Sequence, residues 1–430
     1  MAENMGVPSR RDFMKTAVAT TVAAGGLAVL GSKPLLAEEK KSFKIGLIGC
    51  GGRGTGALGD CLKAGEALGL EMNVVALCDA FGDRASRPAA QHKVPKDRVF
   101  VGFDEYRRFL ETDVEVVLMA TPPAFRPAHL EASINAGKHV FMEKPVAVDP
   151  PGIRRIIEAG EVAKKKKLSI VAGTQRRHSR QYRETKRAIE EGVIGKIRGG
   201  SIYWCGGALW RRERDPSWSD AEYMVRNWVS FAEMSGDHIV EQHVHNIDVM
   251  NWFMGTHPLS ALGFGMRARR KTGNQFDFFS IDYEFPDGVH IHSMCRQIND
   301  TSGGVSEHLV GERGVAAGIY PKDKQVFPAG CPEKGGDYVQ EHIDLLWSII
   351  KGEPVNEAEQ VAISTATAIM GRTAAYTGKK IDWRHMFDPD PNVHKDELYN
   401  LTLRPSAEDF EKGLVRAPAE DVIPLPGKPA

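Results

Sequence analysis

The sequence predicts a two-domain protein: an α/β domain on a parallel sheet, then an α+β domain whose strands pair mainly antiparallel. A chain of 430 residues, 42% of them hydrophobic, is long enough for two or three domains with their own cores. Short β-branched runs alternate with helical periods over residues 42–170, which is typical of a parallel sheet covered on both faces. Several strand-like runs between residues 197 and 311 follow one another without intervening helices, which indicates antiparallel pairing.

Composition excludes several classes of protein. The 56 basic and 56 acidic side chains balance, whereas a nucleic-acid binder needs a basic excess on one face. No heptad or longer repeat is present, so coiled-coil and solenoid folds are excluded. The 6 cysteines lack the spacing of a disulfide framework or a zinc site.

Residues 1–37 are predicted to be a twin-arginine (Tat) signal peptide. Arg10 and Arg11 stand in the order Ser-Arg-Arg-x-Phe-x-Lys, and a short, glycine-broken apolar run over residues 17–31 follows them. Such a run is too short for a comfortable membrane span. The Tat export machinery is therefore an expected partner, and a periplasmic or extracytoplasmic location is expected. Cleavage after Ala37, an uncleaved membrane-tethered leader and a plain basic tail remain open.

The elements of the first domain follow from the alternation of short apolar runs and helical periods. Strands are expected at residues 44–49, 72–78, 114–120 and 139–142. Helices are expected at residues 53–68, 80–91, 104–111, 125–136 and 151–166. Parallel sheets of this kind bind ligands at the carboxyl ends of their strands.

A glycine-rich loop follows the first of these strands and opens a helix. It reads GxGxxG, and its expected ligand-binding residues are Gly49, Gly51, Gly52, Arg53 and Gly54. Glycines there permit the tight turn and the close approach of backbone to a pyrophosphate, which the helix N-terminus favours.

Asp79 ends the second strand, where a carboxylate can accept hydrogen bonds from both hydroxyls of a ribose. It would repel a 2′-phosphate, which favours NAD over NADP, although Arg84 nearby leaves NADP open. A simple helix cap is the alternative role for Asp79.

Two further motifs lie at the same edge of the sheet. Thr121 and Pro122 begin a proline-fixed loop after the 114–120 strand. Glu143, Lys144 and Pro145 follow the 139–142 strand, so that the Lys144 ammonium should point into the cleft. There it needs a partner such as Glu143, a cofactor or a substrate oxygen. A solvent-exposed lysine is the alternative.

Together these motifs resemble the Gfo/Idh/MocA oxidoreductases, the group of glucose–fructose oxidoreductase and inositol dehydrogenase. Glu143-Lys144-Pro145 carries the resemblance most specifically, with the loop 49–54, Thr121-Pro122-Pro123 and Gly137-Lys138-His139-Val140. It implies a dinucleotide-binding Rossmann domain at residues 42–170 and a domain at 171–430 with a large, mostly antiparallel sheet. That sheet would form the floor of the active site and a dimer or tetramer surface. The implied activity is NAD(P)-dependent oxidoreduction of CH–OH groups.

The second domain has its own expected elements. Helices are expected at residues 178–191, 337–350 and 357–377, and strands at 197–205, 259–268, 276–285, 289–297 and 305–311. Pro286-Asp287-Gly288 predicts a turn that joins two of these strands into a hairpin.

A dense polar segment at residues 237–248 is expected to carry the catalytic acid–base pair. Helical spacing places Glu241, His245 and Asp248 on one side. A histidine can take the hydroxyl proton as hydride leaves the carbon, and a carboxylate one turn earlier can orient it. The resemblance implies that His245 is the family's histidine, that Glu241 replaces its aspartate and that His243 adds bulk to the sugar pocket. A metal site, disfavoured by the ligand spacing, and structural polar packing are the alternatives.

Residues just after the end of the first domain at residue 170 complete the expected site. Gln175 could reach the cofactor, and Arg176 and Tyr182 could join Lys144, His243, His245 and Asp248 around the substrate. A charged seam that only joins the domains is the alternative.

The sequence therefore predicts an exported, NAD-dependent oxidoreductase acting on a ring hydroxyl of a sugar, cyclitol or glycoside, as a homo-oligomer and without nucleic-acid partners. Lys144 would polarise the hydroxyl, His245 would take its proton and Glu241 would orient His245. Outside the cytoplasm no NAD pool recycles the cofactor, so tight retention is expected. Two alternatives stay open: a glycosidase that uses transient oxidation without net redox, and a non-catalytic periplasmic sugar-binding protein.

Overall fold

The structure, a computed structural model, describes residues 42–316, 326–422 and 425–426. The predicted signal peptide at 1–37 lies outside the described residues. Within the described part, no helix combines the length and the apolarity that a membrane crossing needs.

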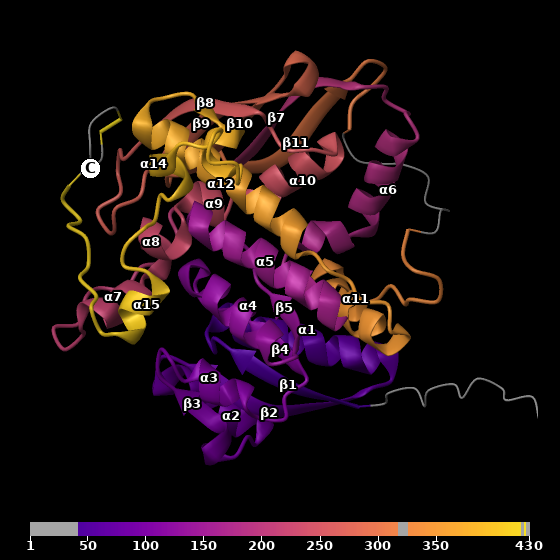
Figure 1. Cartoon of the computed structure of the whole chain (residues 1–430), viewed down its shortest axis with the longest axis vertical. Helices are drawn as coiled ribbons and strands as arrows, with labels where there is room; N and C mark the ends of the chain where they lie inside the picture. Colours follow the sequence, from indigo (N-terminus) through magenta and orange to yellow (C-terminus); the bar gives the residue numbers. More distant parts are fainter. Residues whose placement is uncertain (1–41, 317–325, 423–424, 427–430) are drawn as a thin grey trace, which may run out of the picture. The chain divides into compact units, whose positions relative to one another are not determined.

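The first sheet confirms the predicted Rossmann arrangement (Figure 1). All its strand pairs are parallel and their order is β3-β2-β1-β4-β5-β6. The strands are β1 (Ser42–Ile48), β2 (Glu71–Asp79), β3 (Val99–Val101), β4 (Val116–Met119), β5 (His139–Met142) and β6 (Ile170–Ala172). The order reverses between β1 and β4, and a parallel sheet binds ligands in the crevice at such a point.

Helices cover both faces of this sheet, as the β-branched runs predict. They are α1 (Gly52–Leu68), α2 (Gly82–His92), η1 (Lys96–Arg98), α3 (Tyr106–Leu110), η2 (Pro123–Phe125), α4 (Arg126–Asn135) and α5 (Pro150–Lys166). In β4, Val117 and Met119 enter one core, while Val116 and Leu118 enter another. Alternate residues of a strand point to opposite faces, so both faces of β4 are apolar and buried.

The second sheet is mixed and mostly antiparallel, in the order β11-β7-β10-β9-β8-β12. Its strands are β7 (Ile197–Gly206), β8 (Ser260–Met266), β9 (Phe278–Phe285), β10 (Val289–Gln297), β11 (Gly304–Gly311) and β12 (Ile381–Asp382). The turn η5 (Pro286–Gly288) joins β9 to β10 in the predicted hairpin. β7 and β10 are an exception to the expected pairing, because they run parallel.

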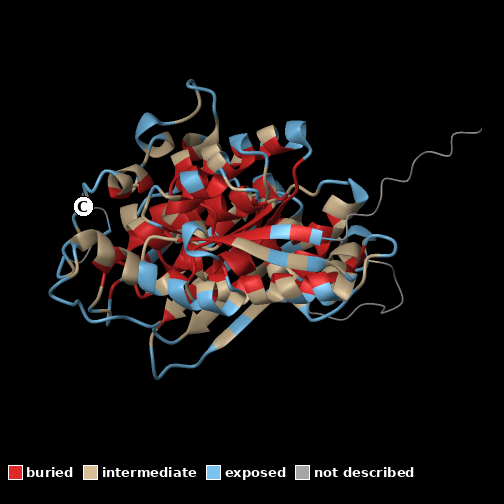
Figure 2. Cartoon of the chain, turned by 90° about the horizontal axis from the view of Figure 1, so that it is seen from below, coloured by how far each residue is buried: buried red, intermediate tan, exposed pale blue. Residues whose placement is uncertain are grey.

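Among the described residues, helices pack on one face of the second sheet. The remaining helical elements are η3 (Gln175–His178), α6 (Arg180–Glu190), α7 (Asp220–Arg226), η4 (Trp228–Ser230), α8 (Ala232–Ser235), α9 (His238–Glu241), α10 (Val244–Met254), α11 (Asp337–Lys351), α12 (Ala358–Thr377), α13 (Trp383–Phe387), α14 (Asp396–Tyr399) and α15 (Ala407–Glu411). α10 and α12 pack against the sheet, whereas Leu262, Phe264 and Met266 of β8 are exposed. Other exposed residues lie on loops, on helices and on parts of some strands (Figure 2).

Helix α11 belongs to the second domain as predicted from the sequence, but it packs on the first domain. Figure 1 shows it beside α1, and its residues Val339 and Ile343 join the core that contains Leu47 and Leu118 of the first sheet. The chain therefore returns from the second domain to cover one face of the first sheet. The described residues, from 42 onward, accordingly form one compact unit.

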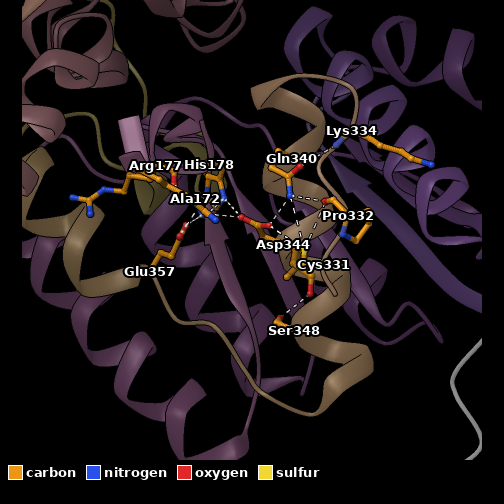
Figure 3. Close-up of polar contacts among 12 residues, drawn as sticks. Ala172, Arg177, His178, Cys331, Pro332, Lys334, Gln340, Asp344, Ser348 and Glu357 are labelled. Carbon is orange, nitrogen blue, oxygen red and sulfur yellow. Dashed lines mark hydrogen bonds and ion pairs between the residues drawn. The ribbon is translucent and has the colours of Figure 1, made fainter. Parts of the chain in front are cut away.

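A buried imidazole holds α11 against the end of the first sheet (Figure 3). His178 Nδ1 lies 2.6 Å from Asp344 Oδ2 of α11, and His178 Nε2 lies 3.5 Å from Glu357 Oε1. Glu357 also accepts a hydrogen bond from Ala172 N of β6 at 2.8 Å, and Arg183 Nη2 donates to the same Asp344 oxygen at 2.5 Å. Burial opposes protonation of His178, but the two carboxylates outweigh it and raise the pKa of His178 to about 10.

We predict that His178→Gln lowers stability by about 3–5 kcal/mol near pH 6, because two buried carboxylates lose their shared cation. The folded pKa of about 10 exceeds the ordinary value of 6.5. The contribution of His178 is therefore complete below about pH 6.5 and is lost as the pH rises towards 10. Thermal unfolding of the wild type, His178→Gln and a control at exposed His308, His308→Gln, at pH 6 and pH 9.5 tests this. A stability difference that does not shrink at the higher pH would contradict it.

Candidate active site

The glycine loop between β1 and α1 is shaped for close backbone approach. Gly49 has φ +95°, and a Cβ on Gly54 would lie 1.8 Å from the Gly49 carbonyl oxygen. Neither position tolerates a side chain in this geometry. A Cβ on Gly51 or Gly52, in contrast, would meet nothing within 4 Å. The loop therefore leaves open space above the N-terminus of α1, where backbone N–H groups and the helix dipole favour a phosphate.

Asp79 is fixed beside this loop. Its Oδ2 accepts a hydrogen bond from Cys50 N at 2.7 Å, and its Oδ1 accepts one from Phe81 N at 2.9 Å. Burial raises the pKa of the Asp79 carboxyl, and the two backbone donors oppose that rise. The N-cap of α2 is Phe81, so the simple cap role is not what the structure shows. Each carboxylate oxygen retains a lone pair for a ribose hydroxyl.

The loop and Asp79 line a cavity of about 430 Å³, a size within the usual range for ligand sites. The first domain contributes Gly49, Gly51, Gly52, Arg53, Gly54, Asp79, Phe81, Phe103, Tyr106, Thr121, Pro122 and Phe125 to its lining. Aromatic rings on its walls suit a planar base. This donor set and open loop fit a dinucleotide.

Three predicted cofactor residues, Glu143, Lys144 and Gln175, lie outside that cavity. Glu143 Oε1 accepts a 2.6 Å hydrogen bond from Arg53 Nε. Gln175 Nε2 lies 3.3 Å from the hydroxyl of Tyr338 in α11, while Gln175 Oε1 is buried without a partner among the described residues.

Sequence reasoning missed Glu341 of α11, which lies next to the Arg53 guanidinium. Glu341 Oε1 is 3.8 Å from Arg53 Nη2, and neither Glu341 oxygen accepts a hydrogen bond from any described residue. Burial, followed by the charge of Glu143, raises the pKa of Glu341 well above its usual range. Its sequence signal was an acid in the second turn of an expected helix.

Lys144 extends across the seam between the domains to α9. Its Nζ donates to the Glu241 carbonyl oxygen at 2.6 Å and lies 3.2 Å from Glu241 Oε1. Of the partners expected for this ammonium, Glu143 is paired with Arg53 instead, while a cofactor or a substrate oxygen stays a prediction. Lys144 and Glu241 are nearly buried, with exposed side-chain fractions of 11% and 9%.

His245 lies on α10, beside the same seam. Its ring stacks on Trp204 of β7, with centroids 5.6 Å apart and planes 22° apart. Burial lowers the pKa of His245 well below 6.5, and the charges of Lys144, Arg176 and His243 lower it further. The imidazole is therefore neutral at pH 7 and able to accept a proton. The charge of Lys144 reaches His245, so the two predicted residues are close enough to interact electrostatically.

The predicted continuous helix over the polar segment is broken. α9 ends at Glu241 and α10 begins at Val244, with His243 as its N-cap. Among the described residues, the Glu241 carboxylate accepts from Lys144 and Gln242 and makes no hydrogen bond to His245. Glu241 therefore positions the lysine, and the predicted role of orienting His245 does not fit this geometry.

Arg176 and Tyr182 meet around a residue that sequence reasoning missed, Glu307 of β11. Arg176 Nη1 donates to Glu307 Oε1, and the Tyr182 hydroxyl donates to Glu307 Oε2 at 3.2 Å. Asn246 Nδ2 donates to Glu307 Oε1 at 2.6 Å. The Arg176 guanidinium also lies 5.8 Å from the centre of the Trp204 ring, next to His245.

His243 and Asp248 do not face the site, contrary to prediction. His243 is fully buried, lies 2.7 Å from Ser293 Oγ through Nε2 and has a pKa lowered by burial to about 3. Asp248 accepts hydrogen bonds from Arg177 Nε at 2.8 Å and from Ser364 at 2.7 Å. Both pack within the second domain, so structural polar packing accounts for them. Among the described residues, no three metal-ligating side chains gather around a point.

The fold and the glycine loop define a dinucleotide-binding protein of the Rossmann class. An oxidoreductase family with an NAD-binding Rossmann fold matches residues 43–173, and the GFO/IDH/MocA C-terminal domain matches residues 182–317. Inositol 2-dehydrogenase from Agrobacterium fabrum is 30% identical over 283 residues, which are 64% of this chain and 74% of the relative. The chain belongs to the Gfo/Idh/MocA oxidoreductase family, and its first domain is an NAD-binding Rossmann domain.

Another curated relative matches a smaller share of the chain, and a solved structure matches a larger one. Inositol 2-dehydrogenase from Pseudomonas fluorescens is 36% identical over 159 residues, 36% of this chain and 44% of the relative. The chain thus spans about half the length of the first curated relatives it matches. Scyllo-inositol dehydrogenase from Lactobacillus casei, solved with NAD(H) and scyllo-inositol, has a TM-score of 0.61 at 20% identity and covers 80% of this chain and 99% of its own. That likeness shows the shared fold.

We predict that Gly54→Ala weakens NAD binding at least about tenfold, because the added methyl would displace the Gly49 carbonyl and with it the loop. Gly59→Ala is the matched control, since a Cβ there, on the same helix, meets nothing within 4 Å. Calorimetric titration with NAD compares the three proteins. Equal affinity of Gly54→Ala and the wild type would refute the assigned loop.

Proposed function

We propose that this protein catalyses NAD-dependent oxidation of a ring hydroxyl on a cyclitol, sugar or glycoside. The observation that supports the proposal is that the Lys144 ammonium bonds to Glu241 across the interdomain seam and that its charge reaches the neutral imidazole of His245. One supplies a positive charge for a substrate oxygen and the other an acceptor for its proton, which are the two needs of alcohol oxidation.

In the proposed reaction the substrate hydroxyl binds between these two side chains. The Lys144 ammonium, held by the carbonyl and carboxylate of Glu241, stabilises negative charge on the hydroxyl oxygen. His245 accepts the hydroxyl proton while the carbon loses a hydride and the C–O bond becomes a carbonyl. NAD, when bound, supplies the hydride acceptor.

The walls beside His245 suit a polyhydroxylated ring. Trp204 offers an aromatic face, as it does to the imidazole, and such faces pack well on the C–H side of a sugar or cyclitol. Glu307, Asn246 and Arg176 form a polar group nearby that can exchange hydrogen bonds with ring hydroxyls. Among the proposed substrate classes, a cyclitol is favoured by the names of the relatives, inositol 2-dehydrogenase and scyllo-inositol dehydrogenase.

Export, retention of the cofactor and assembly belong to the same proposal. The Tat signal predicted at residues 1–37 supports a periplasmic or extracytoplasmic location through the Tat machinery, and a tightly held cofactor follows from that location. The exposed apolar residues Leu262, Phe264 and Met266 support a homo-oligomer joined through the open face of the second sheet.

We predict that Lys144→Ala and His245→Ala each retain NAD but lose at least about 100-fold in kcat, since each removes a group that acts on the reacting hydroxyl. The exposed Lys412 provides a control, Lys412→Ala. Absorbance at 340 nm with a panel of inositols and aldoses measures turnover, and titration measures NAD binding. Full activity in both variants would overturn the assigned roles. Release of an aglycone from glycosides without NADH accumulation would favour the glycosidase alternative.

A separate prediction concerns pH. Because the pKa of His245 lies well below 6.5 before substrate binds, kcat/KM should stay level from pH 7.5 to below pH 6.5, where an ordinary histidine base would already be half protonated. Initial rates across pH 5–8 at low substrate concentration measure this. An acid limb centred at or above pH 6.5 would contradict the neutral, buried base.

A further inference from the structure

The second domain supplies one wall of the dinucleotide cavity. After β7 the chain runs through residues 207–230, here called the cofactor arm, which contains α7 and η4. Its residues Trp210, Arg212, Val225, Arg226 and Trp228 line the cavity, with Asp79 and the glycine loop on the first domain. A dinucleotide in this cavity would therefore contact both domains.

One ion pair joins the arm to the first domain at this wall. Arg226 Nη2 lies 2.9 Å from Asp83 Oδ1, and Arg226 Nη1 lies 3.0 Å from Asp83 Oδ2. Asp83 stands in the first turn of α2, four residues after Asp79. The Arg226 guanidinium also lies 4.3 Å from the centre of the Phe81 ring. Phe81 stands between the two aspartates in the sequence. A two-bond arginine–carboxylate pair fixes orientation as well as distance.

Arg226 is itself held from the arm side. Its Nε donates to Glu222 Oε1 at 2.8 Å, one turn earlier in α7, and its side chain is only 12% exposed. The hydrogen bonds to Asp83 are the main cause that raises the pKa of Arg226 above its ordinary value. The Arg226 side chain is thus preorganised for the contact, so it loses less conformational entropy on pairing with Asp83 than an unrestrained arginine would.

The rest of the arm is tied down by contacts that do not involve the pair. Asn227 is fully buried, and its Oδ1 accepts a 2.7 Å hydrogen bond from Arg212 N, which fixes the loop before α7. Ala417 N donates to Asp220 Oδ2 at 3.0 Å, and the Tyr223 hydroxyl donates to Glu420 Oε1 at 3.0 Å. The arm therefore keeps its fold when the pair is removed.

We propose that the Arg226–Asp83 pair is a latch that holds the cofactor arm over the bound dinucleotide and slows its release. The inference rests on the proposed use of this cavity by NAD. A ligand enclosed by two domains leaves only after their contact opens, so a contact at the rim sets the dissociation rate more than the association rate. Such a latch gives an exported enzyme, without an NAD pool outside, a means to retain its cofactor.

The test measures NADH release directly. Purified wild type, Asp83→Asn, Arg226→Gln and the double variant are loaded with NADH, and loss of its fluorescence is followed after rapid mixing with excess NAD. Asp97→Asn, an exposed acid in η1, is the control. We expect dissociation at least about tenfold faster in each single variant, little further increase in the double variant, and no change in the control.

The outcomes separate two ideas. Unchanged release from both single variants, with normal NADH binding by the wild type, would overturn the latch and leave the proposed function in place. A wild type that binds no dinucleotide would overturn the proposed function and the latch together. Equal unfolding temperatures of wild type and Asp83→Asn exclude a folding defect as the cause of faster release, and a large drop for Asp83→Asn would overturn the latch in favour of a structural role.

Discussion

The hydrogen bond from Lys144 Nζ to the Glu241 carbonyl oxygen is the contact on which the site depends. A nearly buried ammonium at the end of β5 must find acceptors, because an unpaired buried charge is strongly unfavourable. It finds them at the last residue of α9, in the other domain. Helix α10 begins soon after Glu241, and it presents His245 against Trp204. A contact that joins the domains thus lies next to the predicted base.

Local chemistry explains which parts of the structure could be predicted. The glycine loop, Asp79 and the alternating elements are set by backbone conformation and by burial over a few residues, so sequence patterns reveal them. The partners that complete the site are set by tertiary structure. Lys144 and Glu241 are 97 residues apart, Arg176 and Glu307 are 131 apart, and Arg226 and Asp83 are 143 apart. No local pattern specifies such pairs.

The residues predicted wrongly share a physical cause. Helical spacing placed Glu241, His245 and Asp248 on one side, but the helix is broken after Glu241, and α10 is buried on several sides. His243 and Asp248 therefore satisfy Ser293 and Arg177 in the interior. A polar residue on a helix packed between a sheet and another helix more often completes a buried hydrogen-bond pair than faces a ligand.

The second domain contains more buried charge than catalysis alone requires. His178 between Asp344 and Glu357, Arg177 on Asp248, and Arg176 on Glu307 each join separate elements of that domain. Buried ion pairs add little net stability compared with apolar packing, but separating one leaves two unsolvated charges. Separation of the two domains would break a buried contact of this kind, the one between Lys144 and Glu241. At the rim, in contrast, the Asp83 side chain is 60% exposed. Water can solvate the Asp83 carboxylate once its pair with Arg226 separates, so we expect the rim, rather than the seam, to open when a bound dinucleotide is exchanged.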